Sequence, residues 1–307
     1  MNNTRDHGGG LDAAVATYGG ARGGWVDLST GINPVPYPVG DVGQEAWTAL
    51  PDRAAQTRLL DAARAFWNVP EGLDVVAASG ASALIAQMPR VFSGSRVEIP
   101  APTYNEHAAA FRASGWEITE GADLRVLVHP NNPDGRLWDV PALPAVIDES
   151  FCDVMPAASH VGAASDDLVV LKSFGKFWGL AGMRLGFAIC APKMAEKLRD
   201  GLGPWAVSGP ALEIGAQALE DIAWARETRV RLTADAARLH DLMTATGASV
   251  VGGTDLFGLY DVGDAAAFQD RLARAHIWTR VFPYSDRWVR LGLPAPEMWS
   301  RVEAALA

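Results

Sequence analysis

Between residues 72 and 190 the sequence alternates short apolar runs with stretches of helical composition, and this alternation constrains the fold more than any other feature. The apolar runs predict strands at residues 74–78, 96–99, 124–129, 145–148, 168–171 and 184–190. Nearly continuous apolar strands separated by helices are typical of a mainly parallel sheet that is covered on both faces. The sequence therefore predicts an α/β fold built on one large sheet.

Unusual polar residues stand at the carboxyl ends of these predicted strands. They are Ser79-Gly80, Pro102-Thr103-Tyr104, Asn131-Asn132, Asp148 and the segment from Lys172 to Lys176. In open α/β sheets, ligands bind beyond the carboxyl ends of the strands. The positions of these residues therefore predict a ligand site at this edge of the sheet.

The pattern changes after Pro210. Residues 211–245 have helical composition, and five apolar positions are spaced for one buried face: Leu212, Ile214, Ala218, Leu219 and Ile222. Beyond them we expect strands at 249–251, 256–260, 278–282 and 288–291, with a helix at 265–275. We therefore expect a large domain at 36–210, a smaller α/β C-terminal domain at 211–307, and a Gly-, Asn- and Pro-rich segment, 1–35, that packs over the active site.

Composition excludes several classes of function. The net charge of the 307 residues is -10 and no contiguous basic segment offers a footprint for nucleic acid. No apolar run approaches the ~20 residues that a membrane helix needs, and the polar opening lacks the apolar core of a secretory signal. With two cysteines, Cys152 and Cys190, a disulfide framework is not expected. We expect a cytoplasmic protein without nucleic-acid or membrane partners.

The chain contains only four lysines, which are Lys172, Lys176, Lys193 and Lys197. One of them lies in Lys172-Ser-Phe-Gly-Lys176-Phe-Trp-Gly-Leu-Ala-Gly-Met-Arg184-Leu-Gly, which closely resembles the lysine motif of class I and II aminotransferases. In that motif a Ser precedes the lysine by three residues and an Arg follows it by eight. Lys176 satisfies both conditions through Ser173 and Arg184, whereas Lys172 satisfies neither.

Three further motifs resemble the same family and occur in the order that it requires. They are Gly80-Ala81-Ser82, His129-Pro-Asn-Asn132-Pro-Asp-Gly135 and Val146-Ile-Asp148-Glu-Ser-Phe151. The resemblance implies the aspartate-aminotransferase fold, with a mainly parallel sheet of the seven-stranded type, and pyridoxal 5'-phosphate as the cofactor. It also implies that Lys176 carries this cofactor covalently.

The resemblance further implies a role for each residue of the cofactor site. The site would comprise Gly80, Ala81, Ser82, Tyr104, Asn132, Asp148, Phe151, Ser173, Lys176 and Arg184. In it Asp148 would pair with the pyridine nitrogen, Asn132 would meet the phenolic oxygen and Tyr104 would stack on the ring. Backbone N–H groups of Ala81 and Ser82, the Ser173 hydroxyl and Arg184 would hold the phosphate. We expect Lys176, Asp148 and Tyr104 to be catalytic, and no metal.

The N-terminal residues narrow the resemblance to one group within this family. His7-Gly-Gly and Trp25-Val-Asp-Leu-Ser29-Thr-Gly-Ile-Asn33-Pro resemble the opening of threonine-phosphate decarboxylases, close relatives of histidinol-phosphate aminotransferases. Phe151 stands where those aminotransferases usually have Tyr. This resemblance implies a phosphorylated amino-acid substrate, bound through the following five residues: His7, Asn33, Asn132, Arg280 and Arg290. Arg290 would bind the carboxylate and Arg280 the substrate phosphate.

The implied reaction is decarboxylation of L-threonine O-3-phosphate to (R)-1-aminopropan-2-yl phosphate in cobalamin biosynthesis. Two alternatives remain open, a histidinol-phosphate-type aminotransferase and a non-catalytic module that binds the cofactor. Gly175, Lys172 and Leu50 depart from the family pattern, and Leu50 replaces a Tyr that reaches the phosphate in the neighbouring subunit. A homodimer is nevertheless expected for this fold.

Overall fold

The structure is a computed structural model that describes residues 7–142 and 144–307. Its contacts divide the chain into two compact units, which we describe separately. The central unit comprises Pro36–Asn132 and Leu137–Glu227, and the terminal unit comprises the residues up to Val35, Pro133–Arg136 and Thr228–Ala307. Among the described residues, none of the helices combines the length and the apolar composition that a membrane crossing requires.

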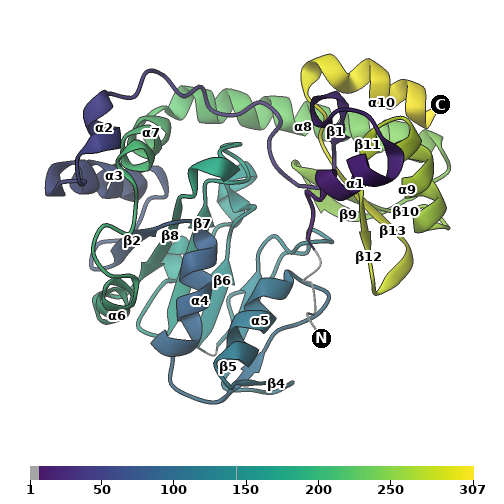
Figure 1. The fold of residues 1–307 in the computed structure, drawn as a ribbon. Coiled ribbons are helices and arrows are strands. Elements are labelled where there is room, and N and C mark those ends of the chain that lie inside the picture. Colours follow the sequence, from purple (N-terminus) through teal and green to yellow (C-terminus); the bar gives the residue numbers. More distant parts are fainter. Residues whose placement is uncertain (1–6, 143) are drawn as a thin grey trace. The chain divides into compact units, whose positions relative to one another are not determined.

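The central unit is built on a seven-stranded sheet with the order β2-β8-β7-β6-β5-β3-β4 (Figure 1). Its strands are β2 (Asp74–Ala78), β3 (Arg96–Glu98), β4 (Glu117–Ile118), β5 (Leu124–Val128), β6 (Ala145–Asp148), β7 (Leu168–Ser173) and β8 (Gly186–Cys190). Only β8 runs antiparallel to its neighbours. The prediction of a mainly parallel sheet is therefore confirmed. The edge strand β4 was not predicted, because two residues are too short to show a pattern.

Helices cover this sheet. Those of the central unit are α2 (Gln44–Thr48), α3 (Arg53–Phe66), α4 (Ala81–Val91), α5 (Asn105–Ala113), α6 (Pro192–Leu202) and α7 (Gly209–Glu220). One core cluster joins α4, α5 and α6 to the sheet, through Leu84, Phe111 and Leu198 against strand residues such as Val126 and Val169. Helices α4 and α5 lie in front of the strands in Figure 1. This packing fixes the first turn of α4 beside the carboxyl ends of the parallel strands.

The helix expected over residues 211–245 is two helices, α7 and α8 (Ile222–Ala245), which are separated at Asp221. The carboxylate of Asp221 accepts a hydrogen bond of 2.9 Å from the backbone N–H of Trp224, so it caps the new helix. Four of the five expected face positions are buried, but Ile222 is 57% exposed. The prediction for Ile222 was wrong because the break at Asp221 restarts the helical phase.

The terminal unit contains two small sheets. An antiparallel sheet has the order β12-β13-β10-β9, and a parallel pair joins β1 to β11. The strands are β1 (Val26–Asp27), β9 (Ser249–Thr254), β10 (Phe257–Asp261), β11 (Ile277–Trp278), β12 (Arg280–Phe282) and β13 (Ser285–Gly292). The helices are α1 (Leu11–Tyr18), α9 (Ala265–Arg274) and α10 (Trp299–Leu306). Arg280 and Arg290 are direct partners in the register of β12 and β13.

The turn Pro133–Arg136 belongs to the terminal unit through a backbone contact with β9. A Cβ atom added to Gly135 would lie 1.9 Å from the carbonyl oxygen of Gly253, and one added to Gly252 would lie 2.0 Å from that of Asp134. Gly135 also has a φ of +71°, which favours glycine. Glycine is therefore required on both sides of this contact.

Candidate active site

One cavity of 140 Å³ in the central unit collects most of the expected cofactor residues. Of the ten, nine line it: Ala81, Ser82, Tyr104, Asn132, Asp148, Phe151, Ser173, Lys176 and Arg184. They come from the carboxyl ends of β5, β6 and β7, from the first turn of α4 and from the loops that follow. The tenth, Gly80, is the N-cap of α4. The site predicted at this edge of the sheet is thus one cavity.

The start of α4 forms one end of the cavity. Gly80 has a φ of +83°, and a Cβ atom there would lie 2.6 Å from Nη2 of Arg184. A Cβ atom on Gly186 would lie 2.3 Å from the backbone nitrogen of Ala81, so β8 also packs directly against this turn. The first N–H groups of a helix lack intrahelical partners and favour anions. Together with the Arg184 guanidinium, they make this turn suited to a phosphate group.

Asp148, the last residue of β6, supplies a buried carboxylate with 2% exposure. Its Oδ1 accepts hydrogen bonds from the backbone N–H of Ser150 at 3.0 Å and from the Ser150 hydroxyl at 2.5 Å. Its Oδ2 lies 2.8 Å from Nε2 of His107. Burial alone would raise the pKa of Asp148, but the hydrogen bond and charge of His107, together with the bonds from Ser150, outweigh burial and lower it. The carboxylate therefore stays ionised.

The sequence analysis missed His107. This residue lies on α5, and its side chain is fully buried. Its Nδ1 has no hydrogen-bond partner among the described residues. The one available signal was its spacing three residues after Tyr104, which places both residues on one side of the helix start. A single histidine in a helix is more often a core residue, so that signal alone was too weak.

Lys176 lies in the turn after β7, with its Nζ 5.2 Å from the centre of the Phe151 ring. Tyr104 occupies the N-cap position of α5, and its ring centre is 6.1 Å from that of His107. The neighbouring Asn131 joins the loops that carry Tyr104 and Asn132. Its Nδ2 donates to the carbonyl of Pro102 at 3.0 Å, and its Oδ1 accepts from Thr103 at 2.7 Å.

Lys172 does not line the cavity. It is 1% exposed, and its Nζ lies 2.6 Å from Glu149. Burial would lower the pKa of Lys172, but the carboxylates of Glu149 and Asp153 outweigh burial and raise it. Because a protonated amine is not a nucleophile, Lys172 is unsuited to a covalent link with a carbonyl group. Lys193 and Lys197 are exposed on α6.

The other expected substrate residues belong to the terminal unit. Arg290 is buried, and its Nη2 donates to the carbonyl of Ser29 at 2.8 Å. Nη1 of Arg280 donates to the carbonyl of His7 at 2.6 Å. Asn33 is buried, and its Oδ1 accepts a hydrogen bond of 2.7 Å from Arg231. Burial and the charge of Arg280 lower the pKa of Arg290 to about 10, so Arg290 remains a cation at neutral pH.

Residues 125–302 match the model of the family described as aminotransferase class I and II. The chain belongs to this family. A threonine-phosphate decarboxylase from Sinorhizobium sp is 38% identical, over 95% of this chain and 93% of the relative. A histidinol-phosphate aminotransferase from Symbiobacterium thermophilum is 26% identical, over 81% and 79% of the two chains.

Solved structures of the family share the fold. The structure of a histidinol-phosphate aminotransferase from Sinorhizobium meliloti, in complex with pyridoxal-5'-phosphate, has a TM-score of 0.82 and 18% identity. It covers 96% of this chain, and the match spans 92% of that structure. The expected aspartate-aminotransferase fold is thereby confirmed. The cavity fits the same cofactor by its chemistry, because it combines an anion-binding helix start, a buried ionised carboxylate and a lysine.

Proposed function

We propose that this protein is a pyridoxal-phosphate-dependent decarboxylase that acts on L-threonine O-3-phosphate and releases (R)-1-aminopropan-2-yl phosphate. One observation carries the proposal. The identity with a threonine-phosphate decarboxylase is 38% over nearly the whole of both chains, against 26% with a histidinol-phosphate aminotransferase over a shorter match. The product is the class of compound that cobalamin biosynthesis consumes.

The residues of the central unit hold and polarise the cofactor. Pyridoxal phosphate, when bound, supplies an electron sink for the bond that breaks at the substrate Cα. Lys176 binds the cofactor covalently and accepts or returns a proton at its Nζ. Asp148 stays ionised, and its carboxylate keeps a proton on the ring nitrogen by charge pairing. The start of α4, Ser173 and Arg184 hold the phosphate.

The residues of the terminal unit fit a substrate with two anionic groups. Arg280 and Arg290 face each other across β12 and β13, and like charges in this register destabilise a sheet unless anions neutralise them. Arg290 binds the substrate carboxylate and Arg280 the substrate phosphate, since a guanidinium fork meets either group with two hydrogen bonds. His7 and Asn33 contribute further contacts to the phosphate. Binding energy from the phosphate then orients the carboxylate for release.

Phe151 favours the decarboxylase over the alternative. Its ring lies against Lys176 and brings no hydroxyl group to the cavity, where the related aminotransferases usually have Tyr. The deciding experiment is an assay with L-threonine O-3-phosphate. We expect one equivalent of carbon dioxide for each substrate consumed and no keto acid. Keto acid without carbon dioxide would instead favour a histidinol-phosphate-type aminotransferase.

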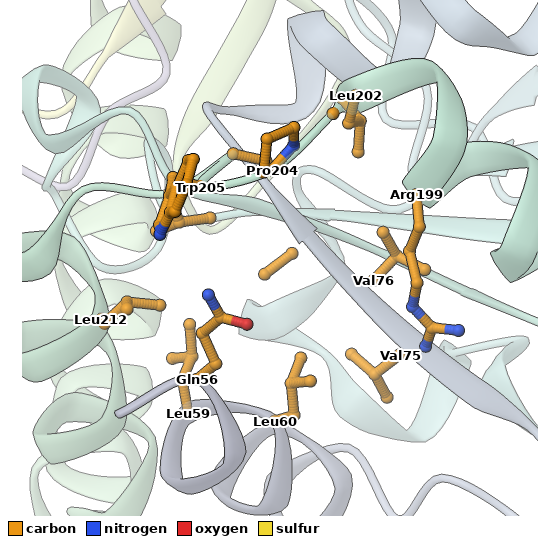
Figure 2. Close-up of a pocket in the computed structure, with 14 residues that line it drawn as sticks. Gln56, Leu59, Leu60, Val75, Val76, Arg199, Leu202, Pro204, Trp205 and Leu212 are labelled. Carbon is orange, nitrogen blue, oxygen red and sulfur yellow. The ribbon is translucent and has the colours of Figure 1, made fainter. Parts of the chain in front are cut away.

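The protein also acts as a homodimer, and an apolar surface of the central unit supports this part of the proposal. A cavity of 290 Å³ lies between α3, β2 and the loop after α6, with mostly apolar walls (Figure 2). Trp205 at its wall is 53% exposed, and Trp47 and Leu50 are also exposed. Leu212 lines both this cavity and the adjacent one that contains Leu50. Exposed apolar areas of this kind mark protein contacts.

Light scattering tests the homodimer. We expect twice the mass of the chain for the wild-type protein and a shift towards the monomer in Trp205→Asp. Val230→Asp is the control, because Val230 is also exposed, at 69%, but lies on α8 in the terminal unit. A monomeric wild-type protein would refute the dimer and leave the reaction untouched.

A further inference from the structure

A cluster of three ionisable side chains is buried behind the strand ends that form the cofactor cavity. Nζ of Lys172 lies 2.6 Å from Oε2 of Glu149 and 3.4 Å from Oδ1 of Asp153. All three side chains are almost completely buried. Burial would raise the pKa of Glu149, but the charge and hydrogen bond of Lys172 outweigh burial and lower it. The cluster therefore consists of a buried ammonium and buried carboxylates.

Further donors satisfy the carboxylates of this cluster. Oδ1 of Asp153 accepts a hydrogen bond of 2.9 Å from the indole of Trp67, and Oδ2 accepts one of 3.1 Å from that of Trp178. Glu149 accepts from the hydroxyl of Ser159 at 2.7 Å and from the backbone N–H of His160 at 2.5 Å. Buried charges are tolerated only when they are paired and hydrogen-bonded, and each carboxylate here meets both conditions.

Two members of the cluster are adjacent in sequence to residues of the cofactor cavity. Glu149 follows Asp148, and Lys172 precedes Ser173 in β7. Successive side chains of an extended strand point to opposite faces, so the ion pair lies on the opposite face from the cavity residues. Trp178, which donates to Asp153, lies two residues after Lys176. The ion pair thus joins the end of β6, the end of β7 and the turn that bears Lys176.

The same network reaches the loop that carries Asn132. The ring of His160 donates from Nε2 to the carbonyl of Trp138 at 2.7 Å. The backbone N–H of Trp138 in turn donates to Nδ1 of His129 at 3.0 Å. His129 and Trp138 bracket the turn after Asn132, so this bond closes the loop at its base. The backbones that present Asp148, Lys176 and Asn132 therefore share one hydrogen-bonded network.

We propose that Lys172 is a positioning residue for the cofactor. Through its ion pairs with Glu149 and Asp153, it fixes the positions of the Asp148 carboxylate and the Lys176 amine relative to each other. Lys172 itself does not touch the cavity, so it acts only through these neighbours. The inference rests on the cofactor part of the proposed function and is independent of which substrate is used.

The test compares three variants of the cofactor-loaded protein. The first is Lys172→Met, which removes the charge and keeps much of the side-chain volume. The second is Lys172→Arg, which restores the charge. The third is Lys193→Met, a control at an exposed lysine on α6. The readouts are the pH midpoint of the visible absorption band of the cofactor-lysine linkage, the dissociation constant of pyridoxal phosphate, and the thermal unfolding midpoint.

We expect Lys172→Met to shift the absorption midpoint and to weaken cofactor binding roughly tenfold, a coupling usual within one buried network. Lys172→Arg should restore both values, and Lys193→Met should leave both unchanged. If Lys172→Met does not fold, Glu149→Gln replaces it, because Gln keeps one acceptor oxygen, which can serve the backbone N–H of His160, while the charge is lost. A variant with wild-type midpoint and cofactor affinity but a lower unfolding temperature overturns the inference. Wild-type protein that binds the cofactor but releases no carbon dioxide overturns only the proposed reaction.

Discussion

Nε2 of His107 lies 2.8 Å from Oδ2 of Asp148, and both side chains are buried. The pair joins α5 to the end of β6, and no single sequence motif contains both residues. The hydrogen bond and charge of His107 contribute most to keeping the buried carboxylate charged, and the bonds from Ser150 add to them. The charge of the cofactor site therefore depends on a residue that does not line the cavity.

We expect His107→Phe to destabilise the protein in a pH-dependent manner. The folded pKa of Asp148 is depressed, so its contribution to stability is present above the unfolded pKa of about 3.9 and is lost as the pH falls through the folded pKa. Loss of the donor should lower the free energy of unfolding by about 1.5–3 kcal/mol at pH 7. Urea denaturation at pH 7, 5 and 3 should show that the deficit shrinks towards pH 3. His107→Gln, which keeps an N–H donor, is the control, and a deficit that is equal at every pH would contradict the prediction.

Lys176→Ala should abolish activity and the covalent cofactor linkage. Borohydride reduces such a linkage, so the wild-type protein should retain the cofactor after denaturation and the variant should not. Lys172→Met should still be labelled, because the buried Lys172 does not line the cavity. Mass spectrometry of the labelled peptide measures both results. Labelling at Lys172 in the wild-type protein would refute the assignment of Lys176.

Arg280→Ala should weaken binding of phosphorylated substrates selectively. A guanidinium that makes charge-assisted hydrogen bonds with a phosphate contributes about 1.5–3 kcal/mol, so KM for L-threonine O-3-phosphate should rise roughly 10- to 150-fold. The affinity for L-threonine, measured by the change in cofactor absorption, should change little. Arg271→Ala, at an exposed arginine of α9, is the matched control. Equal losses for both ligands would indicate that Arg280 does not bind the phosphate.

Gly135→Ala should be more destabilising than Gly121→Ala. Both glycines have a positive φ, +71° and +65°, so alanine is strained at either position by about 1–2 kcal/mol. At Gly121 nothing lies within 4 Å of an added Cβ atom, whereas at Gly135 that atom meets the backbone of Gly253. The difference between the two free energies of unfolding, measured by urea denaturation, isolates the steric cost. Equal values would show that the turn moves away from β9 without penalty.

The parts of the protein that could be predicted from the sequence are those with a regular apolar pattern or a recognisable motif. The strands around Val126, Ile147 and Val170 are continuous apolar runs, and the structure confirms them as central strands. Residues placed at the ends of those strands, such as Asp148 and Lys176, do share one cavity. Strand ends are predictable in this way because neighbouring parallel strands finish at the same edge of the sheet.

The remainder depends on contacts that no local pattern encodes. His107 acquires its role only when α5 packs beside β6, and the Lys172–Glu149 pair forms only when β6 and β7 are adjacent. Ile222 fits the helical period but follows a helix break. The roles of His7, Asn33, Arg280 and Arg290 towards a substrate stay predictions, as does the expectation that residues 1–35 pack over the active site.

The parallel pairing of β1 with β11 brings together Val26 and Ile277, which lie near opposite ends of the described chain. During synthesis on the ribosome, β1 emerges long before β11. It therefore stays unpaired while the whole central sheet is being translated. A nascent chain that is interrupted before Ile277 leaves Val26 and its flanking aromatic Trp25 without the edge on which they dock. Truncated products of this protein are therefore expected to retain the large sheet. They should expose the apolar N-terminal segment around Trp25 and Val26, to which chaperones can bind.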